Sequence, residues 1–280
     1  MIQYSFNLEI KAYNVAKRKQ RIAYHRQMES IRNVNSKIMR RNLRTVFNKQ
    51  KKAIKELEDP TDFKTVETAI HQTDGAMRGV FQRAYQKTAH DIMPMVMSTP
   101  KVKSLFIAEK KDADPFKQYF DVVLAQWVEE NLGIKIVKVQ QTTLEQLRLS
   151  YTRISKAYEE NALQTSFRDA VIKDFLKTYD TNISTFRANC IARTECAAAS
   201  NRAALETTKA MGGNPMKEWL AVPDEDTRDT HKAMDGKVIA MDDTFNVNGS
   251  IMDAPLDSTH GANVREIANC RCDIGFRYNF

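Results

Sequence analysis

Residues 31–57 read IRNVNSKIMRRNLRTVFNKQKKAIKEL, and this stretch decides the fold class. Its apolar residues recur mostly three, four or seven positions apart, so they share one face of a helix, and Lys and Arg fill much of the remainder. Asp59-Pro60 ends the helix, because the residue before a proline avoids the helical region. Such a helix cannot bury its apolar face alone, so the stretch predicts a mainly helical protein.

The same periodicity extends through the next part of the chain. It predicts a second helix over about 61–97, which forms an α-hairpin with the first. Residues 98–114 lose the periodicity and are typical of a linker or domain junction. A third helix is expected over 116–133, ended by Gly133, and the β-branched residues 134–139 predict a short strand.

Further helices are expected before the sequence changes character. They cover about 142–162, 166–179 and 184–211, where Ser166 and Asp169 resemble a capping box and Gly212-Gly213 ends the last helix. After Pro215 the sequence offers short extended segments at 216–222, 237–241 and 272–280, separated by loops rich in Asp, Asn, Gly and Pro.

The fold class is therefore mainly α with a small α+β C-terminal module, in which a long N-terminal helical hairpin precedes a helical body and a loop-rich unit with short strands. The expected organisation is a basic helical arm or hairpin at 1–98 and a linker with a connecting helix at 99–133. A domain at 134–280 follows, helical over 134–213 and loop-rich over 214–280.

Composition excludes several classes of protein. No run of 18 apolar residues appears, so no membrane span is expected, and the N-terminus lacks the apolar stretch of a signal peptide. Four cysteines in 280 residues are too few for a disulfide scaffold. We therefore expect a protein that is made in a reducing cytoplasm.

The positive charge lies at the N-terminus. Residues 1–59 hold 15 Lys or Arg against 5 Asp or Glu, a net of +10, and the other 221 residues hold 28 against 30, a net of −2. This asymmetry points to nucleic acid or an acidic protein surface as a partner, whereas a solvated helix face is the plainer interpretation. The residues expected to make the contact are Lys17, Arg18, Lys19, Arg40, Arg41, Arg44, Lys51 and Lys52.

An ordered set of short motifs occupies the second half of the chain. It comprises IARTE (191–195), Asn201, Trp219, DEDTRDTH (224–231), Asp235-Gly236, Phe245, Pro255, Gly261 and NCRC (269–272). Over residues 134–280 this order resembles the phage Mu F-like head morphogenesis family. The residues that carry the motif are Arg193, Thr194, Glu195, Asn201, Trp219, Asp226, Arg228, His231, Gly236, Asn269, Cys270, Arg271 and Cys272. The chain departs from the usual pattern at Ala254-Pro255-Leu256 and at Met234.

The resemblance implies a late virion protein rather than an enzyme. Members are minor head proteins of tailed double-stranded DNA phages, so the expected partners are a portal protein, a major capsid or scaffold protein, and double-stranded DNA bound without sequence preference. The expected location is inside the head, after assembly in the host cytoplasm. Some relatives carry a toxin or enzyme domain after this module; the sequence stops eight residues past Cys272, so no such extension is expected.

The alternative is an enzyme. Arg193 and Glu195 form an Arg-x-Glu fragment that also occurs in ADP-ribosyltransferases, and His231 with Asp235 could serve a metal-dependent hydrolase. Against this, the sequence has no Gly-rich phosphate loop and no clear nucleophile–base pair. We instead expect Arg193 and Glu195 to pair with loops of the C-terminal unit, and Asp226 to cap a short helix.

Cys270 and Cys272 lie two residues apart, so in an extended segment their side chains point to one side. A disulfide across this spacing would be strained. With His231 and His260 they would make a Cys2His2 zinc site, but the spacing departs from known zinc motifs. The sequence therefore favours two small buried residues and no cofactor, with structural zinc as the alternative. Cys190 and Cys196 are expected in or near the core.

Overall fold

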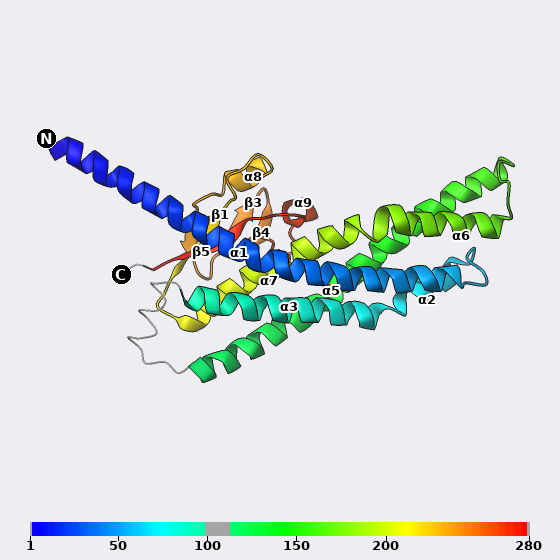
Figure 1. The fold of residues 1–280 in the computed structure, drawn as a ribbon, viewed down its shortest axis with the longest axis horizontal. Helices are drawn as coiled ribbons and strands as arrows, with labels where there is room; N and C mark the ends of the chain where they lie inside the picture. Colours follow the sequence, from blue (N-terminus) through cyan, green and yellow to red (C-terminus); the bar gives the residue numbers. More distant parts are fainter. Residues whose placement is uncertain (1, 99–112, 279–280) are drawn as a thin grey trace. The chain divides into compact units, whose positions relative to one another are not determined.

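The computed structural model describes residues 2–98 and 113–278, and the side chains of 19–98 and 120–278. Long helices dominate and short antiparallel strands follow them, which confirms the expected fold class (Figure 1). The helices are α1 (Ile2–Lys55), α2 (Phe63–His71), α3 (Asp74–Met97), α5 (Ala113–Glu159), α6 (Phe167–Thr178) and α7 (Phe186–Met211), with a π-helical turn η1 at Tyr179–Ile183. In the described residues, no helix is long and apolar enough to cross a bilayer.

The chain divides into two compact units, each assembled from separated segments. The C-terminal unit comprises Met1–Val34, Thr88–Asp121 and Ala197–Phe280. The helical unit comprises Asn35–Lys87 and Val122–Cys196. Each unit therefore combines segments that are distant in sequence. The domains expected from the sequence were instead continuous segments, with boundaries near 98 and 133. The expected linker at 98–114 lies almost entirely outside the described residues.

The helical unit contains α2, α6 and parts of four longer helices, around side chains such as Phe47, Phe81 and Phe175. A buried amide network joins its elements: Gln50 donates to Thr73 (2.8 Å) and to Gln140 (2.9 Å), and Gln140 donates to Asp74 (2.6 Å). Paired in this way, buried amides avoid the cost of lost hydrogen bonds with water.

Three secondary-structure predictions for the long helices are wrong. The helix expected over 61–97 is interrupted at Gln72–Thr73, and it forms α2 and α3. The strand expected at 134–139 is instead the middle of α5, and Gly133 does not end a helix. The reason is tertiary packing. Ile136 and Val139 are buried with helical spacing from Leu132, Leu144 and Leu147, and this burial overrides their β-propensity.

The C-terminal unit holds the strands. Strands β2 (Val238–Ala240), β1 (Met216–Leu220) and β5 (Asp273–Arg277) form an antiparallel sheet in that order. Strands β3 (Phe245–Val247) and β4 (Ser250–Met252) form a hairpin. The short helices α8 (Asp229–Lys232) and α9 (Val264–Ile267) complete the module. Its core consists of the side chains Trp219, Met234, Phe245, Val247, Met252, Leu256, Ile267, Cys270 and Cys272, together with Ala197 and Ala198 of α7.

The β3–β4 hairpin was not predicted, although the sequence contains a recognisable turn motif for it. Asn248 and Gly249 occupy the turn with φ of 50° and 82°. A two-residue turn with both residues at positive φ is type I′, which favours Asn-Gly between alternating apolar residues. The stretch FNVNGSIM at 245–252 carries that pattern.

Candidate functional site

The main cluster of reactive side chains lies where α8 meets the segment that leads into β5. The Nδ1 atom of His231 is 3.4 Å from Cys270 Sγ and 3.4 Å from Cys272 Sγ. The backbone N–H of Cys272 donates to Cys270 Sγ (3.4 Å). All three side chains are buried, with 1–4% of their surface exposed. The structure therefore confirms that both cysteines point to one side, and it adds a histidine as their shared partner.

Glu266 of α9 holds the imidazole of His231 at Nε2, the ring nitrogen that does not face the cysteines. His231 Nε2 lies 3.0 Å from Glu266 Oε2, and Thr230 donates to the same oxygen (2.9 Å). A carboxylate at Nε2 places the proton there, so Nδ1 presents its lone pair to the two sulfurs. The Trp219 ring packs edge-on against the imidazole, with ring centroids 5.5 Å apart.

The local environment shifts the pKa of several of these groups. Burial acts to raise the pKa of Glu266, but the hydrogen bonds from Thr230 and Asn248 and the neighbouring His231 outweigh it and hold that pKa below its usual value. The contact with Cys272 lowers the pKa of Cys270. The same contact, together with burial, raises the pKa of Cys272.

His260 is not part of this cluster. Its Nε2 lies 3.1 Å from Asp253 Oδ1 and 3.9 Å from Asp257 Oδ2. Asp257 also accepts from the backbone N–H groups of Asp253 and Thr259, which explains the group as a loop-stabilising network. The Cys2His2 set, which the sequence offered as the alternative to a metal-free core, is therefore not assembled: the structure brings together His231, Cys270 and Cys272 without His260.

A second buried group, which we call the Arg32 network, consists of Arg32, Ser200, Asn201 and Asp273. Arg32 of α1 pairs with Asp273, which is fully buried, and donates to Ser200 and to Asn201 Oδ1 (2.9 Å). His25 Nδ1 also contacts the Asp273 carboxylate. The network joins α1 and α7 to the first residue of β5, within the C-terminal unit.

Asn201 uses its whole amide in this network. Its Nδ2 donates to the carbonyl groups of Pro255 (2.9 Å) and Cys272 (3.0 Å), and its Oδ1 accepts from Ile274 N (3.2 Å) as well as from Arg32. Two donors and two acceptor positions are the full capacity of an asparagine side chain. Asn201 therefore aligns the segments on both sides of the two cysteines.

The remaining motif residues have local structural tasks. Arg271 makes a bidentate pair with Asp224 (2.6 Å for each bond), and Arg228 donates to Ala268 O (2.6 Å). The Arg271 guanidinium holds the pKa of Asp224 below its usual value. Gly236 adopts φ of +78°, and Asn269 has φ of 56°. These conformations favour Gly and Asn and explain their positions.

The structure contradicts one expectation and one alternative around α8. The N-cap position is Arg228 rather than Asp226, whose side chain is 89% exposed and lies 3.9 Å from Arg271. His231 and Asp235 do not act together either. Asp235 accepts from Ala221 N (2.9 Å) and pairs with Arg21, while His231 faces the cysteines. Because α8 spans only Asp229–Lys232, Asp235 lies beyond it and does not share its face.

Glu195 also has a partner that the sequence did not indicate. Tyr85 donates to Glu195, and Lys135 Nζ lies 2.9 Å from Glu195 Oε2, all within the helical unit. Burial and the Glu195 charge raise the pKa of Tyr85 far above its usual value. The expected pairing of Glu195 with the C-terminal loops is therefore wrong. Thr194 is buried and Arg193 is exposed on α7.

The basic residues of α1 separate into two groups. Arg40 donates to Asn189 (3.0 Å) and Lys51 pairs with Asp180 (2.6 Å), so both make contacts within the helical unit. Lys19, Arg41, Arg44 and Lys52 are exposed, whereas the side chains of Lys17 and Arg18 lie outside those described. Within the helical unit, helical spacing puts five exposed residues on one side of α1, which we call the basic face: Lys37, Arg41, Arg44, Lys52 and Lys55.

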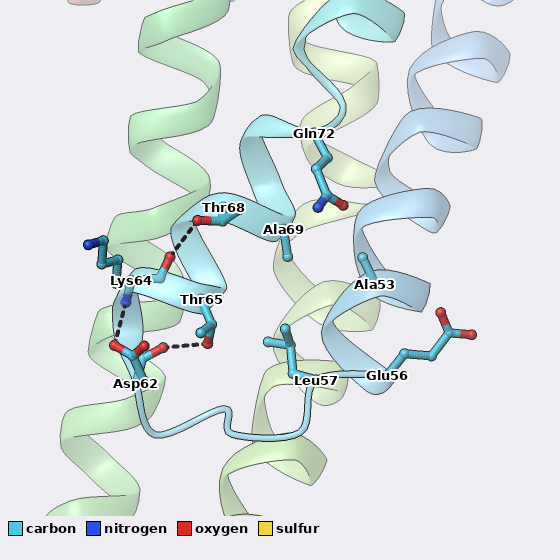
Figure 2. A pocket seen from close by; sticks show the side chains of 9 residues that line it. All are labelled: Ala53, Glu56, Leu57, Asp62, Lys64, Thr65, Thr68, Ala69 and Gln72. Atoms are coloured by element: carbon cyan, nitrogen blue, oxygen red, sulfur yellow. Dashed lines mark hydrogen bonds between the residues drawn. The ribbon is translucent and has the colours of Figure 1, made fainter.

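A surface hollow of about 440 Å³ lies between the end of α1 and α2 (Figure 2). Three of the polar side chains around it are engaged within α2 and the residue before it. Thr65 donates to Asp62 O (2.7 Å), Thr68 donates to Lys64 O (2.9 Å), and the Asp62 carboxylate caps Lys64 N (3.0 Å). The rest of the lining includes Ala53, Leu57 and Ala69. These hydrogen bonds stabilise the first turns of α2, so the polar side chains that make them have a structural role.

Comparison with known proteins assigns the part of the chain that holds this site. Residues 150–275 match the family model described as Phage Mu protein F like protein. This segment is a phage Mu protein F-like domain. The Mu F-like domain contains every motif residue from Arg193 to Cys272. Arg32, the partner of Asn201 and Asp273, lies outside it on α1.

Part of the chain is also similar to a bacterial enzyme. The chain is 35% identical over 96 residues to the NAD(+)--arginine ADP-ribosyltransferase EFV of Enterococcus faecalis (strain ATCC 700802 / V583). That match covers 33% of this chain and 19% of the relative, so the chain spans about a fifth of the relative's length. No solved structure matches the chain.

Proposed function

We propose that this protein is a minor head component of a tailed double-stranded DNA phage or prophage, acting in head morphogenesis beside the portal. The observation that carries the proposal is the Mu F-like domain at residues 150–275. The site geometry agrees with a structural role. Several motif residues are engaged with one another or with the backbone, as in the partly exposed Arg271–Asp224 pair and the buried hydrogen bond from Asn201 to the Cys272 carbonyl. Paired groups of this kind order loops.

Co-assembly tests this proposal directly. The full chain is co-expressed with the portal and major capsid proteins encoded near its own gene, and assembled heads are separated by sedimentation. We expect the protein in the head fraction, and we expect the portal to co-purify with it. A tagged cytoplasmic protein of similar mass and charge is the control. Heads that lack the protein, together with no portal co-purification, would reject the proposal.

The basic face is the proposed contact with packaged DNA. It extends 18 residues along α1, from Lys37 to Lys55, or about 27 Å at the helical rise. Its side chains are exposed, and the ion pair of Lys52 with Glu56 (3.8 Å) is open to solvent. Arg40 and Lys51 instead contact other elements of the helical unit. An exposed row of cations without a base-reading motif fits contact with phosphates and carries no sequence specificity.

We expect the full chain to bind duplex DNA with an affinity that falls steeply as salt rises. Replacing Lys37, Arg41, Arg44, Lys52 and Lys55 by Gln should flatten the log–log salt dependence by about one unit for each phosphate that is no longer neutralised. Fluorescence anisotropy at several salt concentrations measures both quantities. The matched control replaces five exposed lysines elsewhere in the helical unit: Lys64, Lys138, Lys156, Lys173 and Lys177. Equally weakened binding in both variants would show that net charge alone matters, and an unchanged slope would favour a protein contact.

An enzymatic role is the alternative, and the match to an ADP-ribosyltransferase is the observation that raises it. The match spans 19% of that relative, and here Glu195 is buried against Tyr85 and Lys135. Those contacts support a structural use of the carboxylate, so our proposal is that the chain is not an enzyme. NAD+ cleavage by the full chain that disappears in Glu195→Gln, with the fold intact, would favour the enzyme.

A further inference from the structure

We propose that His231, Cys270 and Cys272 bind a zinc ion that holds the C-terminal module together. The three ligand atoms, one nitrogen and two sulfurs, all lie within 4.8 Å of one another. They come from two parts of the chain that are 39 and 41 residues apart in sequence. The inference is independent of the head-protein function, because it concerns only how this module is built.

The distances fit a tetrahedral metal. Zinc bonds of about 2.3 Å to sulfur and about 2.0 Å to nitrogen at a tetrahedral angle separate the two ligand atoms by about 3.5 Å. The observed separation from His231 Nδ1 is 3.4 Å to each sulfur. A single nitrogen lone pair can accept a hydrogen bond from one thiol, whereas a metal between the three atoms satisfies all of them.

The surroundings of the ligands are those of a built site. Glu266 holds His231 through Nε2, and this arrangement of carboxylate, imidazole and metal is the common one in zinc proteins. The Cys272 N–H donates to Cys270 Sγ, which stabilises a thiolate. Asn201 binds the Cys272 carbonyl and so fixes the backbone at the second ligand.

The ligand chemistry selects the metal. Thiolates and imidazole favour zinc over magnesium or calcium, which take oxygen ligands. On binding, each thiol gives up its proton to solvent, and the product of one Zn²⁺, two thiolates and a neutral imidazole has no net charge. A neutral centre is suited to a buried position, whereas an isolated thiolate is not.

The described residues supply three ligands, so the fourth position takes a solvent oxygen. Glu266 is engaged with His231, Thr230 and Asn248 and is therefore not available as a base for that water. We accordingly assign the zinc a structural role. It would tie α8 to the start of β5, next to the Arg32 network at Asp273.

The test begins with metal content of the purified full chain, expressed with zinc in the medium. We expect about one zinc per chain by mass spectrometry. Cys270→Ser should lose it, whereas Cys190→Ser, on α7, should keep it. His260→Gln should also keep the zinc, because His260 belongs to the Asp253–Asp257 group. Glu266→Gln should retain the site and lower its zinc affinity by about 10- to 100-fold.

A second measurement uses the wild-type chain, so it does not depend on whether Cys270→Ser folds. Chelation followed by Co²⁺ addition should give the thiolate charge-transfer band and the visible bands of a tetrahedral site, and zinc should abolish both. Metal-free protein after expression with zinc, combined with no cobalt bands, would overturn the proposal. Zinc retained by Cys270→Ser, or a disulfide between Cys270 and Cys272 in the protein isolated without reductant, would overturn it too.

Discussion

Arg32→Met is expected to destabilise the C-terminal unit by about 3–5 kcal/mol, since it leaves a buried carboxylate without its main partner. Asp273 is fully buried and pairs with Arg32, which is itself 7% exposed. Burial removes most of the solvent screening that makes surface ion pairs weak. Urea denaturation followed by Trp219 fluorescence measures the change, in a Trp127→Phe background because the chain holds two tryptophans.

The control for this prediction is Arg26→Met on the same helix. Arg26 is exposed, so its replacement should change the free energy of unfolding by no more than about 0.5 kcal/mol. Adding Asp273→Asn to Arg32→Met should recover part of the stability, because no buried charge then remains unpaired. Equal effects at positions 32 and 26 would contradict the assignment of Arg32 to the core of the network.

Asn201→Ala is expected to cost at least about 3 kcal/mol, because several buried backbone groups lose their partner at once. The side chain is fully buried and binds the carbonyls of Pro255 and Cys272 and the N–H of Ile274. Each buried group left unpaired costs about 1–3 kcal/mol. The same Trp219 denaturation experiment measures the destabilisation.

Asn48→Ala provides the matched control, since Asn48 is exposed on α1 and alanine favours helix. Its free energy of unfolding should stay within about 0.5 kcal/mol of the wild type or rise slightly. The Arg32→Met/Asn201→Ala double variant should be destabilised by less than the sum of the two single effects, because the two side chains share a hydrogen bond. Additive effects would show that the two residues act separately.

Sequence patterns were most successful where structure is set locally. The helix beginning at Ser166 is confirmed by a hydrogen bond from Asp169 N to Ser166 Oγ (3.1 Å), and α7 ends before Gly212, which has φ of 73°. The Asn-Gly turn of β3–β4 could have been predicted from its sequence in the same way, but it was not. Capping and turn residues act within a few positions of each other, so their chemistry can be recognised in the sequence.

Patterns failed where distant packing decides the outcome. Residues 134–139 have the composition of a strand, yet the burial of Ile136 and Val139 places them in α5. Asp226 has the properties of a cap but lies exposed, and Glu195 binds Tyr85, which is 110 residues away. None of these outcomes depends on neighbours in the sequence, so local patterns did not reveal them.

By itself the sequence determined the mainly helical fold, the ends of several helices and the ordered motif of the Mu F-like domain, because periodicity, caps and motif order are local properties of the chain. Tertiary structure decided which of those residues meet. In the sequence, His231 and His260 were alternative partners of the two cysteines, and in the folded chain His231 alone contacts Cys270 and Cys272, with Glu266 on its other nitrogen. Arg32 belonged to no motif, yet it reaches Asn201 and Asp273. The physical reason is that a buried charged or polar group needs a partner, and folding supplies that partner from residues that are distant in the sequence.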